Sequence, residues 1–227
     1  MIPAMRRAAR ILSVALITAG IVILADAAVT LAWKEPLSAV YGSLQQSQAR
    51  KELDAARERF LDDRAVRAAH EETDERKRAA RLAGIYAKQI HDGEGIGRIE
   101  IPAIDLDAVV VQGTDTADLQ KGPGHYPTSA LPGQGKTVAI AGHRTTYLAP
   151  FRDIASIAED DEIVLELPYG TFSYRVIETD VVDPTDVGVV DDVGSERLVL
   201  TACHPLYSAA QRYVVTARLD DFELASG

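Results

Sequence analysis

The chain has 227 residues, enough for one sizeable domain with accessory segments, and a formal net charge of −10 at neutral pH. Its excess of acid lies in 81–227, where 23 acidic residues outnumber 11 basic ones; this disfavours nucleic acid as a partner, because phosphate neutralisation dominates that binding. The single cysteine, Cys203, excludes an internal disulfide framework and is either a reactive thiol or an inert buried one.

A long apolar run follows a short basic N-terminus. Three arginines (Arg6, Arg7 and Arg10) precede the stretch 11–33, whose only charge is Asp26. About 20 apolar residues span a bilayer core, so the run predicts a transmembrane anchor. A cleaved signal peptide is the alternative, because Ala-Asp-Ala-Ala at 25–28 imitates a cleavage site. The arginines predict that residues 1–10 are cytoplasmic and that the chain crosses the cell membrane once, with the rest extracellular.

The segment 34–81 is rich in charged residues and good helix formers, and neither Gly nor Pro interrupts it after Gly42. Acidic residues recur four positions before basic ones: Asp63 and Arg67, Glu72 and Arg76, Asp74 and Arg78. The apolar positions form only a weak seam: Leu53, Ala56, Phe60 and Val66. The pattern predicts a solvated helical stalk, with a dimerising coiled coil as the alternative.

The compact domain is predicted over 82–227, where Gly and Pro separate short apolar segments. Strands are expected at 99–101, 108–111, 137–140, 162–167, 172–182, 198–201 and 212–219. Short helices are expected at 116–120 and 150–157. Many short strands with turn signals between them indicate an all-β domain, either a barrel or a sandwich.

The thiol lies at the end of one predicted strand and an arginine begins the next. The run 198–201 leads to Cys203, and Pro205 cannot donate to a strand ladder, so regular pairing should stop there. A short loop follows, and Arg212 opens the second strand. If these strands pair, the thiol and the guanidinium lie at the same end of the sheet.

A histidine ends a third predicted strand. The strand 138–141 runs into Gly142, which lets the backbone bend so that His143 can point off the strand end. Attack of a cysteine on a carbonyl needs a thiolate, a proton donor for the leaving group and a donor for the oxyanion. Cys203, His143 and Arg212 supply these chemistries. His204, next to the thiol, is the rival to His143, and a structural histidine and a solvated arginine remain the plainer interpretations.

A zinc site is the alternative for the same side chains. Its ligands would be Cys203, His204, His143 and His125. The sequence has no C-x-x-C, no H-E-x-x-H and no compact His/Cys spacing, so we expect neither a metal nor another cofactor.

Four blocks in the domain resemble the sortases, membrane-anchored cysteine transpeptidases of Gram-positive cell envelopes. In chain order they are Ile96-Gly97-Arg98-Ile99-Glu100-Ile101-Pro102, Gly122-Pro123-Gly124-His125-Tyr126, Pro132-Gly133-Gln134 leading to Ala141-Gly142-His143-Arg144, and Leu200-Thr201-Ala202-Cys203 with Arg212. They cover about 95–219. The stretch from Gly142 to Tyr147, and Cys-His-Pro followed by Ser208-Ala209, most resemble class E.

The resemblance implies an eight-stranded β-barrel with short helices and an active site at one edge. Cys203 would attack the Thr-Gly bond of an LPXTG-type sorting signal (LAXTG in class E), with His143 as general acid/base and Arg212 holding the substrate carbonyl or oxyanion. Substrate contacts are implied for the residues around this triad: Thr201, Ala202, His204, Tyr147 and His125. The partners would be surface proteins that carry the signal and a cell-wall amino group from lipid II or a stem peptide.

Two positions depart from the family pattern, since Val199 and Ala202 stand where threonine is usual. The residue beside the cysteine is usually close to substrate, so Ala202 bears on recognition. Three other functions stay open. They are a thiol hydrolase that releases peptide to water, a membrane-tethered barrel that binds sorting signals without turnover, and a stalk-mediated dimeric scaffold.

Overall fold

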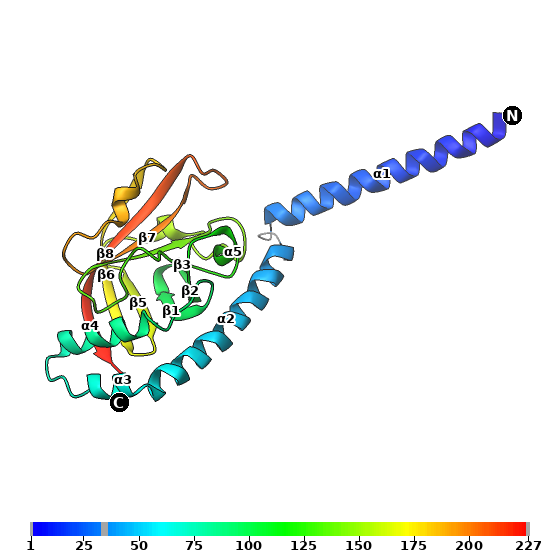
Figure 1. The fold of residues 1–227 in the computed structure, drawn as a ribbon. Helices are drawn as coiled ribbons and strands as arrows, with labels where there is room; N and C mark the ends of the chain where they lie inside the picture. The colour runs from blue at the N-terminus through cyan, green and yellow to red at the C-terminus, as the bar shows by residue number, and fades with distance from the viewer. Residues whose placement is uncertain (1, 33–35, 226–227) are drawn as a thin grey trace.

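The computed structural model describes residues 2–32 and 36–225, and its central element is a closed barrel of eight strands (Figure 1). The strands are β1 (Gly95–Ile101), β2 (Leu106–Gln112), β3 (Gly124–His125), β4 (Thr137–Gly142), β5 (Glu162–Leu167), β6 (Gly170–Val182), β7 (Arg197–His204) and β8 (Gln211–Leu224). Around the barrel they follow the order β1-β2-β3-β4-β7-β8-β6-β5. The expected barrel is therefore confirmed, and the sandwich alternative is wrong.

The helices lie mostly before the barrel in the sequence. They are α1 (Ile2–Ala32), α2 (Pro36–Asp62), α3 (Arg64–Ala69), α4 (Glu75–Tyr86) and α5 (Thr116–Leu119), with short 3-10 helices η1 (Pro102–Ile104), η2 (Ile154–Ser156) and η3 (Val187–Val190). The helix expected over 150–157 is reduced to η2. The two-residue strand β3 was not predicted, because two residues show no alternation.

Two of the strand pairs are parallel, and one of them determines where the candidate site lies. β4 pairs with β7 in parallel from Thr137 opposite Arg197 to Gly142 opposite Ala202, and β7 pairs with β8 in antiparallel fashion. The residues that follow Gly142 and Ala202 therefore leave the sheet at the same end of the barrel.

Side chains alternate between the barrel interior and its outer surface along these strands. On β7, Leu198, Leu200 and Ala202 belong to the main interior core. Val199 instead packs with Ala139 and Val214 in a separate cluster, which marks the outer face of β4, β7 and β8. This alternation assigns each residue near the strand ends to one of the two faces.

Residues 36–81 form α2, α3 and the first part of α4, and where a solvated stalk was expected α2 packs against the barrel. α2 contacts β1 and β2, and Figure 1 shows α2 and α4 alongside the barrel. Phe60 is 1% exposed, and its ring centroid lies 5.4 Å from that of Tyr86 and 6.0 Å from that of Tyr169. Burying such a ring contributes roughly 1.5–3 kcal/mol. The weak apolar seam thus faces the barrel, and α4 crosses the expected boundary between 81 and 82.

The acidic residues of this segment serve a different purpose from the expected ion pairs. Asp63 caps the N-terminus of α3 by accepting from the Ala65 amide, and Asp74 caps α4 by accepting from the Arg76 and Lys77 amides. Carboxylates suit these positions because the first amides of a helix lack partners. None of the three expected i,i+4 pairs forms within the described residues.

One buried amide fastens α2 to the edge of β2. The Gln46 side chain donates from Nε2 to the carbonyls of Val109 (3.0 Å) and Lys121 (2.6 Å). Its Oε1 accepts from the Val109 amide at 2.7 Å. Gln46 is buried, so these bonds satisfy backbone groups that water does not reach.

The run predicted as the membrane anchor forms most of α1, which extends away from the barrel in Figure 1. Its last residue, Trp33, lies outside the described residues. Within the part of the chain that the structure describes, we find no helix with the length and apolarity needed to cross a membrane.

Candidate active site

Cys203 and Arg212 are direct partners across the β7–β8 pair. By alternation, Cys203 shares the outer face with Val199, and Arg212 shares it with Val214. Both side chains are partly exposed. The structure thus brings the predicted nucleophile and the predicted cation together on one face at one end of the barrel.

His143 reaches the same end from β4. It follows Gly142, the residue opposite Ala202, and therefore leaves the sheet beside the end of β7 that carries Cys203. A glycine is required here because a Cβ on Gly142 would lie 2.4 Å from the Phe151 ring. The Phe151 amide in turn donates to the His143 carbonyl at 2.9 Å, which holds the histidine backbone in place.

The His143 ring is half-buried at the barrel end. Burial lowers the pKa of His143 from its ordinary value, because the imidazolium loses hydration. Its Nε2 is buried and has no hydrogen-bond partner among the described residues. The centroid of the Tyr147 ring lies 5.5 Å from that of the His143 ring. The ring centroid of Tyr41 in α2 lies 6.2 Å from that of Tyr147. The site at rest therefore holds a neutral histidine with a free nitrogen.

Arg212 shapes the loop between β7 and β8. Its Nη1 donates to the carbonyls of Ala209 (3.1 Å) and Gln211 (3.0 Å). A guanidinium has five N–H donors, so others remain for a ligand. The cation is thus held next to the thiol while keeping the capacity to bind an oxygen.

Thr201 lies two residues before the thiol on the outer face. It is buried, and its hydroxyl lies 3.0 Å from that of Tyr126. This bond joins the segment after β3 to β7 at a position two residues before Cys203.

Ala202 and His204 flank Cys203 in the sequence. Ala202 is 4% exposed and belongs to the barrel core, so its side chain points away from the outer face that carries Cys203. The predicted contact between Ala202 and substrate stays a prediction, and the Ala202 side chain lies on the core side of β7. His204 Nδ1 accepts from Arg144 at 3.2 Å, so this ring nitrogen is already occupied. This arrangement favours His143 over His204 as the acid/base.

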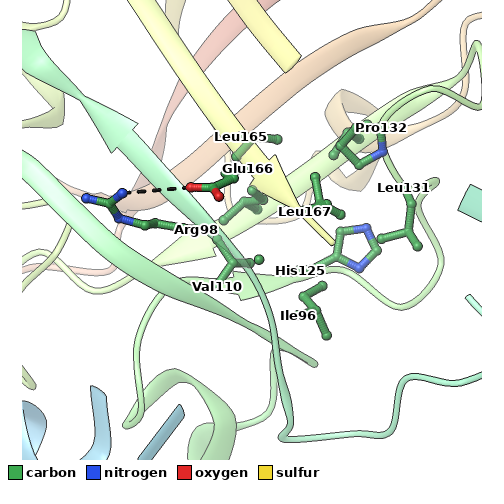
Figure 2. A pocket seen from close by; sticks show the side chains of 12 residues that line it. Ile96, Arg98, Val110, His125, Leu131, Pro132, Leu165, Glu166 and Leu167 are labelled. Carbon is green, nitrogen blue, oxygen red and sulfur yellow. Dashed lines mark ion pairs between the residues drawn. The ribbon is translucent and has the colours of Figure 1, made fainter. Parts of the chain in front are cut away.

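His125, which was expected to bind substrate, is buried within the barrel and bonded to the protein itself. It is 3% exposed and lies beside a small cavity of about 20 Å³ (Figure 2). The ring is surrounded there by Ile96, Leu131 and Leu167. Its Nε2 donates to the Ala130 carbonyl at 2.9 Å, and its Nδ1 lies 2.9 Å from Gln112 Oε1. Burial lowers the pKa of His125 to about 4.

The zinc alternative finds no support in the arrangement of donors. Among residues 2–32 and 36–225, no group of three or more His, Cys, Asp or Glu side chains is placed to hold a metal ion. His125 is buried elsewhere and His204 is bound to Arg144.

Arg144 was not predicted to be a functional residue. It is 7% exposed and bonds to the Cys203 carbonyl, to His204 and to the Arg152 carbonyl. Its signals in the sequence were its position directly after His143 and its place at the end of the block from Ala141 to Arg144. A charged residue there is ordinarily expected to point to solvent.

Comparisons with known proteins agree with this geometry. A family model described as Sortase domain matches residues 99–220. Sortase D of Bacillus subtilis is 35% identical over 127 residues, which are 54% of this chain and 63% of that protein. The solved structure of sortase E from Streptomyces avermitilis superposes with a TM-score of 0.55 and 34% identity, covering 59% of this chain and 93% of that one. A sortase D5 transpeptidase from Clostridium perfringens gives a TM-score of 0.60 and 26% identity over 77% of this chain and 99% of that one.

The chain spans about three-fifths of the length of the first two curated relatives that it matches. The residues matched by the family model, 99–220, include most of the strands from β1 to β8. They also include Cys203, His143 and Arg212 at the barrel end.

Proposed function

We propose that this chain, which belongs to the sortase family, is a cysteine transpeptidase. It joins proteins that bear a C-terminal sorting signal to a cell-wall amine. The observation that carries the proposal is the convergence of Cys203, His143 and Arg212 at one barrel end, from three neighbouring strands. The hydrolase and the non-catalytic barrel remain as outcomes of the test.

In the first half-reaction neutral His143 takes the proton of the Cys203 thiol, and the resulting thiolate adds to the threonine carbonyl of an LPXTG or LAXTG signal. The electron pair moves onto the carbonyl oxygen, which Arg212 stabilises. The tetrahedral adduct then collapses, the Thr–Gly C–N bond breaks, and His143 gives its proton to the leaving glycine amine. The product is a thioester between Cys203 and the threonine.

In the second half-reaction an amine from lipid II or a stem peptide adds to the thioester carbon. His143, now neutral, takes the proton of that amine, and the C–S bond breaks to regenerate the thiolate. The lowered pKa of His143 suits this step, because a neutral imidazole is the form that accepts a proton.

The experiment uses the full chain in detergent micelles, an LAXTG or an LPXTG peptide, and a glycine or diamino-acid acceptor. Intact mass then reports a peptide adduct on the protein. We expect an adduct that is absent in Cys203→Ala and discharged by the amine faster than by water. Equal discharge by water would favour the hydrolase. Peptide binding without any adduct would favour the non-catalytic barrel.

We also propose that the run 11–33 anchors the protein in the cell membrane with residues 1–10 cytoplasmic and the barrel outside. The support is the sequence of the whole run, together with the exposed apolar side chains of α1, from 59% exposed at Ile17 to 71% at Leu24. The full chain should partition into lipid vesicles. Replacing Ile17 and Val22 together with aspartate should release it, whereas Ser43→Asp in α2 should not. Equal partition of all three proteins would contradict the anchor.

A further inference from the structure

Arg144 is the only buried arginine in the described part of the chain. It directly follows His143, and within the described residues no carboxylate forms an ion pair with it. Burial lowers the pKa of Arg144 from its ordinary value, although a guanidinium stays protonated in proteins. A buried cation that is solvated only by carbonyls and an imidazole needs an explanation, because burying charge is costly.

The contacts of Arg144 join three segments. Nη1 donates to the Cys203 carbonyl at 3.3 Å and to His204 Nδ1 at 3.2 Å. Nε and Nη2 both donate to the Arg152 carbonyl at 3.2 Å. One guanidinium therefore links the residue after His143, the end of β7 and the loop that leads into η2.

The link lies where the strand ladder stops. The pairing of β4 with β7 ends at Gly142 opposite Ala202, one residue before His143 and Cys203. Beyond that point no ladder between these two strands holds the two groups together. The Arg144 guanidinium crosses the same gap, because it donates to the backbone carbonyl of Cys203.

We propose that Arg144 is a positioning residue that holds the Cys203 backbone at a set distance from His143, an inference that rests on the proposed function of those two residues. Only a guanidinium spans all these acceptors, because its donors form a rigid planar fork, whereas an ammonium is a single point of charge. Lysine at this position keeps the charge and loses the bridge.

The test compares the full chain with Arg144→Lys in the amine-dependent transfer assay. Since misplacement of reacting groups by about 1 Å costs about 100-fold, we expect kcat to fall about 10- to 100-fold. KM for the peptide should stay within about a factor of three, because the Arg144 guanidinium is buried and its donors are used within the protein. Arg175→Lys is the matched control: this guanidinium also donates to a backbone carbonyl, that of Asp160, but on β6, and kcat should not change.

The outcomes separate this proposal from the proposed function. If the wild-type chain forms no adduct, the proposed function fails first. If the wild type is active and Arg144→Lys keeps both its kcat and its melting temperature, the positioning role is overturned while the function stands. Should Arg144→Lys not fold, Arg144→Gln, whose amide keeps one donor without a buried charge, takes its place with the same expected loss of kcat. Failure of both variants to fold would assign Arg144 to domain stability alone and also overturn the proposal.

Discussion

Cys203 and Arg212 face each other across β7 and β8 as directly paired residues, so the thiol and the guanidinium occupy adjacent positions on one face of the barrel. The loop that joins the strands is held by Arg212 itself, through the carbonyls of Ala209 and Gln211. The antiparallel pairing of β7 with β8 therefore determines the position of the cation relative to the thiol.

Removal of the Arg212 guanidinium should slow formation of the thioester. We expect Arg212→Ala to lower the initial rate of adduct formation about 100- to 1,000-fold, the loss typical of removing one oxyanion donor. Arg212→Lys should recover part of this rate through its charge. Arg218→Ala, an exposed position on the same strand, serves as the control. An unchanged rate in Arg212→Ala, measured by intact mass, would remove the residue from the site.

The titration of His143 should reflect its cover by Tyr147. Burial lowers the pKa of His143 from the ordinary value of 6.5, and the Tyr147 ring contributes to that burial. NMR titration of histidine-labelled protein should therefore show a midpoint below 6.5. In Tyr147→Ala, water reaches the imidazole and the midpoint should rise towards 6.5. Tyr207→Ala, at an exposed ring in the β7–β8 loop, should leave the midpoint where it was; an equal shift in both variants would contradict the assignment.

His125 should make the domain sensitive to acid. Burial lowers its pKa to about 4 in the folded chain, against 6.5 when unfolded. Between these values the unfolded chain binds the extra proton, so the free energy of unfolding rises with pH across this interval and falls on acidification. His125 alone should account for about 3 kcal/mol between pH 6.5 and pH 4.

Urea unfolding at pH 7, 6, 5 and 4.5 measures the effect of His125. In His125→Gln the pH dependence of the unfolding free energy should be smaller by that amount, although the variant starts from a lower stability. Ser43→Ala, at an exposed residue without a titratable group, should keep the wild-type dependence. The same slope in His125→Gln as in the wild type would sink the prediction.

Gln46 should determine whether α2 stays docked. Gln46→Leu leaves the amide and carbonyl of Val109 and the carbonyl of Lys121 without their side-chain partner. Because each buried unsatisfied group costs about 1–3 kcal/mol and water can reach part of the opened edge, we expect a loss of about 2–4 kcal/mol in the free energy of unfolding. Gln48→Leu, two residues along on the exposed face, should stay within about 0.5 kcal/mol. Circular dichroism during urea unfolding provides the measurement, and similar losses in both variants would mean that the Gln46 amide does not fasten α2.

Local features of the sequence were enough to predict seven of the eight strands and the position of the thiol and the arginine. The end of β7 was predicted from Pro205 and from the apolar and β-branched run before Cys203. The next strand was predicted to begin at Arg212, after a short loop. These signals act over a few residues, so they do not depend on what the chain packs against. The same reasoning placed His143 at a strand end, and the structure brings that end to the thiol through the parallel pairing of β4 with β7.

Closure of the barrel decided what the sequence left open. A strand pattern does not say which side becomes the interior, so only the closed barrel turned Ala202 inward and enclosed His125. A weak apolar seam does not say what surface it meets, so only the docked helix α2 showed that Phe60 and Gln46 are buried. Arg144 is the sharpest case, because its acceptors, Cys203 and Arg152, come from separate segments that meet only once the chain has folded. The sequence by itself thus determined the elements and the chemical groups, whereas contacts between distant segments decided which of those groups face the site.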